Sequence, residues 1–113
     1  MEKLKNTLRH LRDIFDIVFV FCYLKIFKRI DRIESTTGTS DLQFLFFAAR
    51  DGWGSGAIVE IGAYKGKSTV ALALGSKAKA RERIVSVDPH EEGVKEIYLK
   101  NLDLLGVADK VIS

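Results

Sequence analysis

The sequence predicts an α/β protein with a parallel sheet, preceded by a long amphipathic N-terminal helix. Two short apolar runs, at residues 57–61 and 84–87, are each followed by a segment with helical periodicity, and a third apolar run begins at residue 110. Strands that alternate with helices favour right-handed crossovers and therefore a parallel sheet. With 113 residues, of which 47% are hydrophobic and 29% charged, the chain can form one modest globular core.

Residues 2–34 contain no proline or glycine, and their apolar positions recur at intervals of three and four. This spacing predicts one long helix with an apolar stripe. The stripe residues are Leu4, Leu8, Leu11, Phe15, Val18, Cys22, Ile26, Ile30 and Ile33. Two interpretations stay open: the stripe packs on the domain or on a partner chain, or it lies on a membrane surface with basic flanks at the headgroups. The apolar stretch 14–27 is shorter than the roughly 20 residues of a spanning helix.

The rest of the chain is expected to form a second unit, so we divide the chain into residues 1–35 and 36–113, with residues 35–40 as a polar linker. Ser40 or Thr39 is predicted to cap a helix that ends near Asp51, and residues 51–56 form a glycine-rich turn. Helices over about 67–80 and 94–105 follow the first two strands, and Gly106 is placed to end the second of them. Cys22, the single cysteine, is expected to be a small buried hydrophobic residue.

The candidate site lies between the first strand and its helix, in the segment IVEIGAYKGKST at residues 58–69. Gly62 and Gly66 permit positive φ and let a ligand approach the backbone, and the amides at a helix N-terminus suit an electron-rich group. Asp88 ends the second strand, twenty-two residues after Gly66. An acid at about this distance holds ribose hydroxyls in nucleotide-binding α/β folds.

Two common phosphate-binding motifs do not fit this segment. A P-loop would need glycine at position 61, which is Ile61, and the dinucleotide motif G-x-G-x-x-G would need glycine at position 64, which is Tyr64. Glu60, near the end of the first strand, would repel a pyrophosphate and favour a ligand that carries positive charge. A P-loop nucleotide-binding protein is therefore the least favoured alternative.

Residues 59–69 together with residues 85–88 (VSVD) resemble the class I S-adenosylmethionine-dependent methyltransferases, and in particular their small-molecule O-methyltransferase-like group. The resemblance covers roughly residues 40–113. It implies a Rossmann-like three-layer parallel sheet, S-adenosylmethionine as the cofactor, and methyl transfer to an oxygen of a small-molecule acceptor. Such transfer depends on placing the electrophilic methyl group in line with the nucleophile.

The resemblance also implies which residues bind the cofactor. The methionine part would be surrounded by Glu60 and by the backbone of three loop residues, Gly62, Ala63 and Tyr64. Gly66 would keep the loop tight, and Ser68 would donate its hydroxyl to the cofactor carboxylate. Asp88 would accept hydrogen bonds from both ribose hydroxyls, and Pro89 or His90 would lie beside the adenine. Lys65 and Lys67 are expected to be solvated.

A whole domain of this family continues through four more strands, so we expect an N-terminal half-domain, truncated after about three strands and inactive alone. No catalytic residue and no metal ligand is assigned. The free edge of the first strand predicts homo-oligomers or aggregation. A non-catalytic cofactor-binding or membrane-docking module is the alternative function. We expect a cytoplasmic protein, in contact with the membrane only if residues 2–34 bind it, and no nucleic-acid partner.

Overall fold

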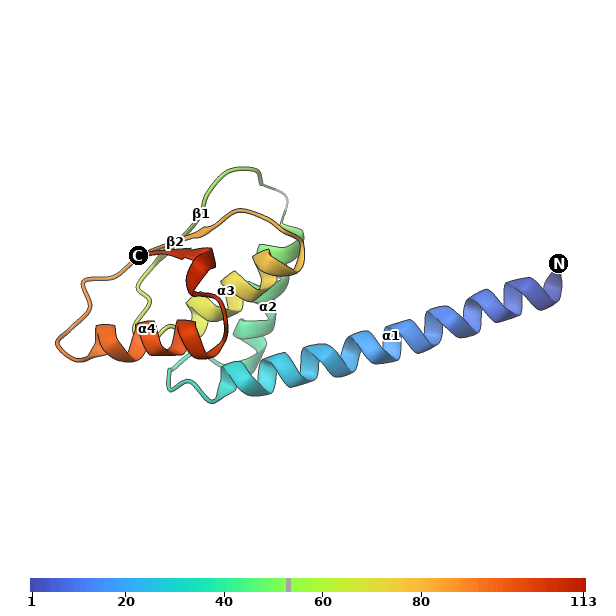
Figure 1. The fold of residues 1–113 in the computed structure, drawn as a ribbon, viewed down its shortest axis with the longest axis horizontal. Helices are drawn as coiled ribbons and strands as arrows, with labels where there is room; N and C mark the ends of the chain where they lie inside the picture. The colour runs from blue at the N-terminus through green and yellow to red at the C-terminus, as the bar shows by residue number, and fades with distance from the viewer. Residues whose placement is uncertain (53) are drawn as a thin grey trace.

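A computed structural model describes residues 1–52 and 54–113, which form a parallel sheet with helices packed against it (Figure 1). Trp53, in the predicted glycine-rich turn, lies outside the described residues. The elements, in chain order, are α1 (Glu2–Asp31), α2 (Thr39–Asp51), β1 (Ile58–Ile61), α3 (Lys67–Ala78), β2 (Ile84–Val87), α4 (Val94–Leu104), the 3₁₀ turn η1 (Ala108–Lys110) and β3 (Val111–Ile112).

The sheet has the order β1-β2-β3 with both pairs parallel, which confirms the predicted α/β class. Ile58 pairs with Ile84, and Ile84 pairs in turn with Val111. The predicted ends shift by up to three residues: α1 ends at Asp31 and not at residue 34, and α3 ends at Ala78 and not at residue 80.

The helices lie on one face of the sheet (Figure 1). Both crossovers proceed in the same direction along the sheet, so right-handedness places α3 and α4 on the same side. Burial alternates accordingly: Glu60, Ile84 and Ser86 are buried toward the helices. The opposite face is aliphatic, and no described element covers it. Its exposed residues are Val59, Ile61, Val87 and Ile112, with Ile61 86% exposed.

The core is densest where α2 crosses α3. A Cβ built on Gly75 would lie 2.1 Å from the carbonyl oxygen of Phe46, so only glycine allows the two backbones to approach this closely. Phe46 is 1% exposed, and its ring meets the rings of Tyr23 and Phe27 from α1 at centroid distances of 5.1 and 5.4 Å. The C-terminal end of α1 is therefore part of the same core.

Most of α1 extends away from the domain, as Figure 1 shows. Within the helix only Phe27 and Ile30 are buried. Cys22 is exposed, so the expectation of a buried cysteine is wrong: the helix leaves the domain before its apolar stripe can be covered. In the described part of the chain, no helix is long and apolar enough to cross a membrane.

The helix ends follow the predictions only in part. The N-cap of α2 is Gly38, with no side-chain hydrogen bond to the first turn, so the predicted cap at Thr39 or Ser40 is wrong. At the end of α4, Gly106 has a φ of 68°, and its N–H donates to the carbonyl of Asp103 at 3.0 Å. This is the left-handed termination predicted for Gly106.

Candidate functional site

Asp88 holds the loop that connects β1 to α3. Its Oδ2 accepts hydrogen bonds from the backbone N–H groups of Ala63 at 2.7 Å and Tyr64 at 2.9 Å, and its Oδ1 accepts one from the N–H of His90 at 2.7 Å. These bonds hold the pKa of Asp88 below its ordinary value, the Tyr64 amide contributing most, then those of His90 and Ala63. The ionised carboxylate thereby joins the end of β2 to the loop.

Two further loop amides also have protein partners. Gly62 N–H donates to the Val87 carbonyl and Gly66 N–H to the Ala63 carbonyl, both at 2.8 Å. A phosphate cradle needs several free N–H groups that converge on one point. In this loop the amides at positions 62, 63, 64 and 66 already donate to oxygens of the chain.

The loop conformation depends on left-handed backbone at three positions. Gly62 and Gly66 have φ values of 86° and 90°, as the sequence predicts, and Tyr64 has a φ of 48°, which it does not. A Cβ on Gly66 would also lie 3.0 Å from Cδ2 of Tyr98, whereas a Cβ on Gly62 would meet nothing within 4 Å. Gly66 is thus required by both its dihedral angle and the ring beneath it.

Glu60 is buried, at 9% exposure, and points toward the helix layer. Its carboxylate accepts hydrogen bonds from the hydroxyls of Ser68 and Thr69 in the first turn of α3, and from Ser86 Oγ in β2 at 3.4 Å. Three hydroxyls therefore satisfy an acid that would be costly to bury alone. In this arrangement the Ser68 hydroxyl donates to Glu60.

Tyr98 and His90 pack beneath and beside the loop. The Tyr98 ring is fully buried, and burial is the main cause that raises the pKa of its phenol. The His90 ring lies 4.8 Å from it, and His90 Nδ1 is 3.5 Å from Asp88 Oδ1. The His90 side chain is therefore largely enclosed, whereas its neighbour Pro89 is exposed. No local feature of the sequence indicates that Tyr98 lies beneath the loop. The helical spacing predicts only that it lies on the apolar face of α4.

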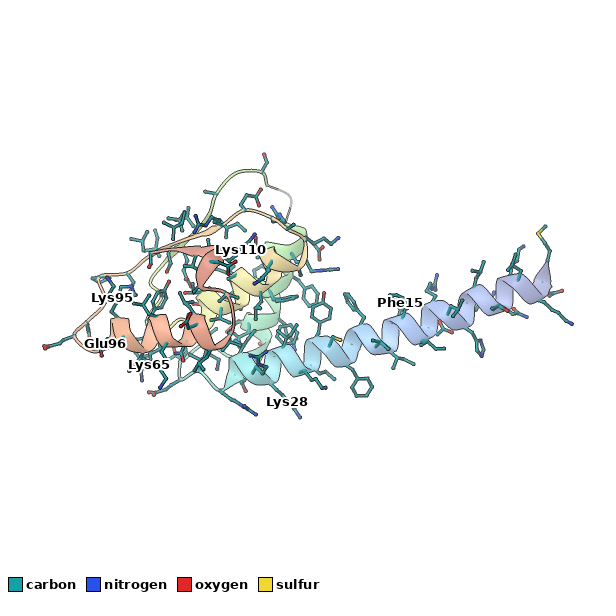
Figure 2. All side chains as sticks on the ribbon, viewed as in Figure 1. Phe15, Lys28, Lys65, Lys95, Glu96 and Lys110 are labelled. Atoms are coloured by element: carbon teal, nitrogen blue, oxygen red, sulfur yellow. The ribbon has the colours of Figure 1, made fainter. Side chains whose placement is uncertain are left out.

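Lys65 and Lys67 are not solvated, so that expectation is wrong. Lys67 Nζ lies 2.9 Å from Asp31 Oδ1 with its side chain 7% exposed, and Lys65 Nζ lies 2.6 Å from Glu34 Oε2. The ion pair with Glu34 is the largest cause that raises the pKa of Lys65. Both lysines pair with acids at or just after the C-terminal end of α1, Asp31 and Glu34, and so bind this segment to the loop. Figure 2 labels Lys65 on the side of the domain near α4.

An open hollow of about 370 Å³ lies over the loop. Sites for small molecules have volumes of about 300–1,000 Å³. Its lining residues are Ser35, Thr36, Thr37, Gly62, Ala63, Tyr64 and Ser68. The sequence predicts residues 35–37 only as part of a linker. Their run of three hydroxyl side chains is the one local signal that could have indicated a place in the site. Asp88, Pro89 and His90 follow β2 next to the loop, but they do not line the hollow.

These features define a Rossmann-like α/β fold in which an acid after β2 holds a glycine loop after β1. The chain is similar in structure to cofactor-bound Rv0187 from MTB, with a TM-score of 0.59 and 25% sequence identity. The match covers 82% of this chain and 41% of that one, so the chain spans about two fifths of its length. No protein-family model and no curated protein matches the sequence.

Proposed function

We propose that the chain binds S-adenosylmethionine over the loop of residues 62–66, as part of a methyltransferase that modifies an oxygen of a small molecule. The observation that carries this proposal is the charge at the loop. Glu60 and Asp88 are both held by neutral donors, and neither has a lysine or arginine partner among the described residues. The two nearby lysines are already paired with acids of the N-terminal segment.

This charge pattern suits a cationic cofactor. S-adenosylmethionine carries a sulfonium and an ammonium group, which two uncompensated carboxylates attract, whereas they repel the phosphates of ATP or NAD. The loop amides at positions 62, 63, 64 and 66 support the same choice, because they already donate to protein oxygens. A similar solved structure that holds a cofactor adds general support for ligand binding by this fold.

The residues of the hollow have complementary roles in this proposal. Of the hydroxyls that line the hollow, Ser68 already donates to Glu60 and Ser35 donates to Thr37 Oγ1 at 3.1 Å, so Thr36 and Thr37 offer the donors for the cofactor carboxylate. Asp88 Oδ1 accepts one backbone hydrogen bond and keeps acceptor capacity for a ribose hydroxyl, while Oδ2 is used by two amides. The bound cofactor would supply the electrophilic methyl group. The described residues bind and orient it, and none is assigned as a base for the acceptor.

Isothermal titration calorimetry of the full chain tests the proposal. We expect S-adenosylmethionine or S-adenosylhomocysteine to bind more tightly than NAD or ATP with magnesium. Asp88→Ala should weaken binding by about 1.5–3 kcal/mol, or roughly 10- to 150-fold, the range for hydrogen bonds to a charged group. The matched control is Asp109→Ala, at an acid that is 79% exposed and outside the site. Tighter binding of ATP with magnesium would overturn the choice of cofactor.

A further inference from the structure

The exposed stripe of α1 has an unusually regular spacing. Leu4, Leu8, Leu11, Phe15, Val18 and Cys22 follow one another at intervals of four, three, four, three and four residues. All six are exposed, and Phe15, labelled in Figure 2, is 78% exposed. A strict alternation of three and four is the spacing of a coiled-coil seam, and here it runs through a wider apolar surface that also exposes Ile14, Ile17, Phe19, Val20, Phe21 and Leu24.

The spacing is also the same in both directions along the helix. Two copies of α1 in antiparallel orientation, with a two-fold axis at residue 13, would pair every stripe residue with another stripe residue. Leu4 would face Cys22 of the other copy, Leu8 would face Val18, and Leu11 would face Phe15. Leu4 and Cys22 are eighteen residues apart, so the paired length is about 27 Å. A surface that is complementary to itself is what a two-fold dimer needs.

A groove on the domain continues this stripe. Phe15, Val18 and Cys22 also line an apolar groove of about 290 Å³, whose far wall is formed by Phe46 of α2 and by Leu74 of α3 together with Ala78. In the antiparallel arrangement, the first turns of the second helix would end beside Cys22, at the mouth of this groove. The stripe and the groove thus form one continuous apolar surface.

We propose that a second copy of this chain docks on that surface, through an antiparallel pair of α1 helices whose N-terminal turns lie against the groove of the other copy. This assembly goes beyond the proposed cofactor binding. Stripe and groove comprise about a dozen residues per chain, fewer than the 20–30 of a standard interface, so the dimer is reversible and concentration-dependent. A lipid surface requires no two-fold spacing, and Asp13 and Asp16 offset part of the attraction of the basic residues of α1 to anionic headgroups.

Disulfide cross-linking of the full chain tests the orientation directly, because Cys22 is the single cysteine. Leu4→Cys should form a disulfide-linked dimer under mild oxidation, through Cys22 of the second copy. Wild type should not, because its two Cys22 residues would be about 27 Å apart, far beyond disulfide reach. Leu4→Cys combined with Cys22→Ser should also stay unlinked. The matched control is Asn6→Cys, on the opposite side of the helix.

Cross-linking of Leu4→Cys no faster than of Asn6→Cys would overturn the proposal, and so would a wild-type dimer linked through Cys22, which indicates parallel helices.

Sedimentation velocity gives an independent measurement. Leu11→Asp, at a residue that is 54% exposed and close to the two-fold axis, should weaken the dimer at least tenfold, and Asn6→Asp should not. Added salt should strengthen the dimer, because the chains carry a net charge of +3 and Arg12 lies at the axis. A chain that stays monomeric and binds phosphatidylserine vesicles in a salt-sensitive manner would refute dimerisation in favour of a membrane.

Discussion

Replacement of Asp88 by asparagine tests whether its carboxylate holds the loop as the geometry indicates. The two side chains have the same shape, but asparagine replaces one acceptor oxygen by an NH₂ donor. Three backbone N–H groups point at the carboxylate, two at Oδ2 and one at Oδ1. Whichever way the amide is turned, its NH₂ group faces at least one N–H donor. The less costly orientation keeps its oxygen toward Ala63 and Tyr64 and leaves the N–H of His90 without an acceptor.

The cost follows from these three bonds. An N–H group that loses its acceptor costs about 1–3 kcal/mol, and a hydrogen bond to a neutral acceptor is weaker than one to a charged acceptor by about 1 kcal/mol. Solvation of the exposed Tyr64 amide offsets part of the loss. We expect Asp88→Asn to lower the free energy of unfolding by about 3 kcal/mol, a large share of the roughly 5–15 kcal/mol of a small domain.

Urea unfolding followed by far-UV circular dichroism measures this effect at pH 7. With an m-value of about 1.5 kcal/mol/M, the midpoint should fall by about 2 M. Asp109→Asn is the matched control, because Asp109 is 79% exposed and lies 3.8 Å from Lys77, and it should change the free energy of unfolding by less than about 0.5 kcal/mol. Equal midpoints for the two variants would refute the role assigned to Asp88.

Three further predictions concern the core, the loop and pH. Gly75→Ala should destabilise the fold by about 3 kcal/mol or more in urea unfolding, because its Cβ would lie 2.1 Å from a backbone oxygen of α2. Gly66→Ala should cost more than Gly62→Ala, about 2–3 against about 1 kcal/mol, since both positions have positive φ but only the Cβ at position 66 meets a buried ring. The lowered pKa of Asp88 contributes stability that is fully present above its ordinary pKa of 3.8 and is lost as the pH falls through its lower folded value. The free energy of unfolding, measured from pH 5 down to pH 2, should therefore decline more steeply in wild type than in Asp88→Asn.

The sequence predicts the order of the elements and the place of the loop because both depend on local signals. Apolar runs, helical periodicity and paired glycines are readable within a window of a few residues, and they locate β1, α3 and β2 to within one or two residues. The left-handed glycines at positions 62, 66 and 106 follow from the same local chemistry.

The contacts that assemble the site are not local, and the sequence does not reveal them. Lys67 lies 36 residues from Asp31, which it pairs with, and nothing in either segment indicates that partner. The sequence alone predicts that Lys67 is solvated, because it does not show that the end of α1 packs against the loop. The hydroxyls of residues 35–37 enter the hollow for the same reason. Cys22 is exposed because the domain covers only the C-terminal end of α1.

The open edge of β1 has a consequence for how firmly the loop is held. Among the described residues β1 is bonded on one side only, to β2, so the strand that leads into the loop has a single neighbour. Segments with exposed backbone hydrogen bonds open at the low end of local free energies. Amide exchange should therefore be faster in residues 58–61 than in the central strand, β2. A ligand that bridges the loop and the end of β2 would slow exchange in β1 without touching it, so exchange protection there would report binding from a distance.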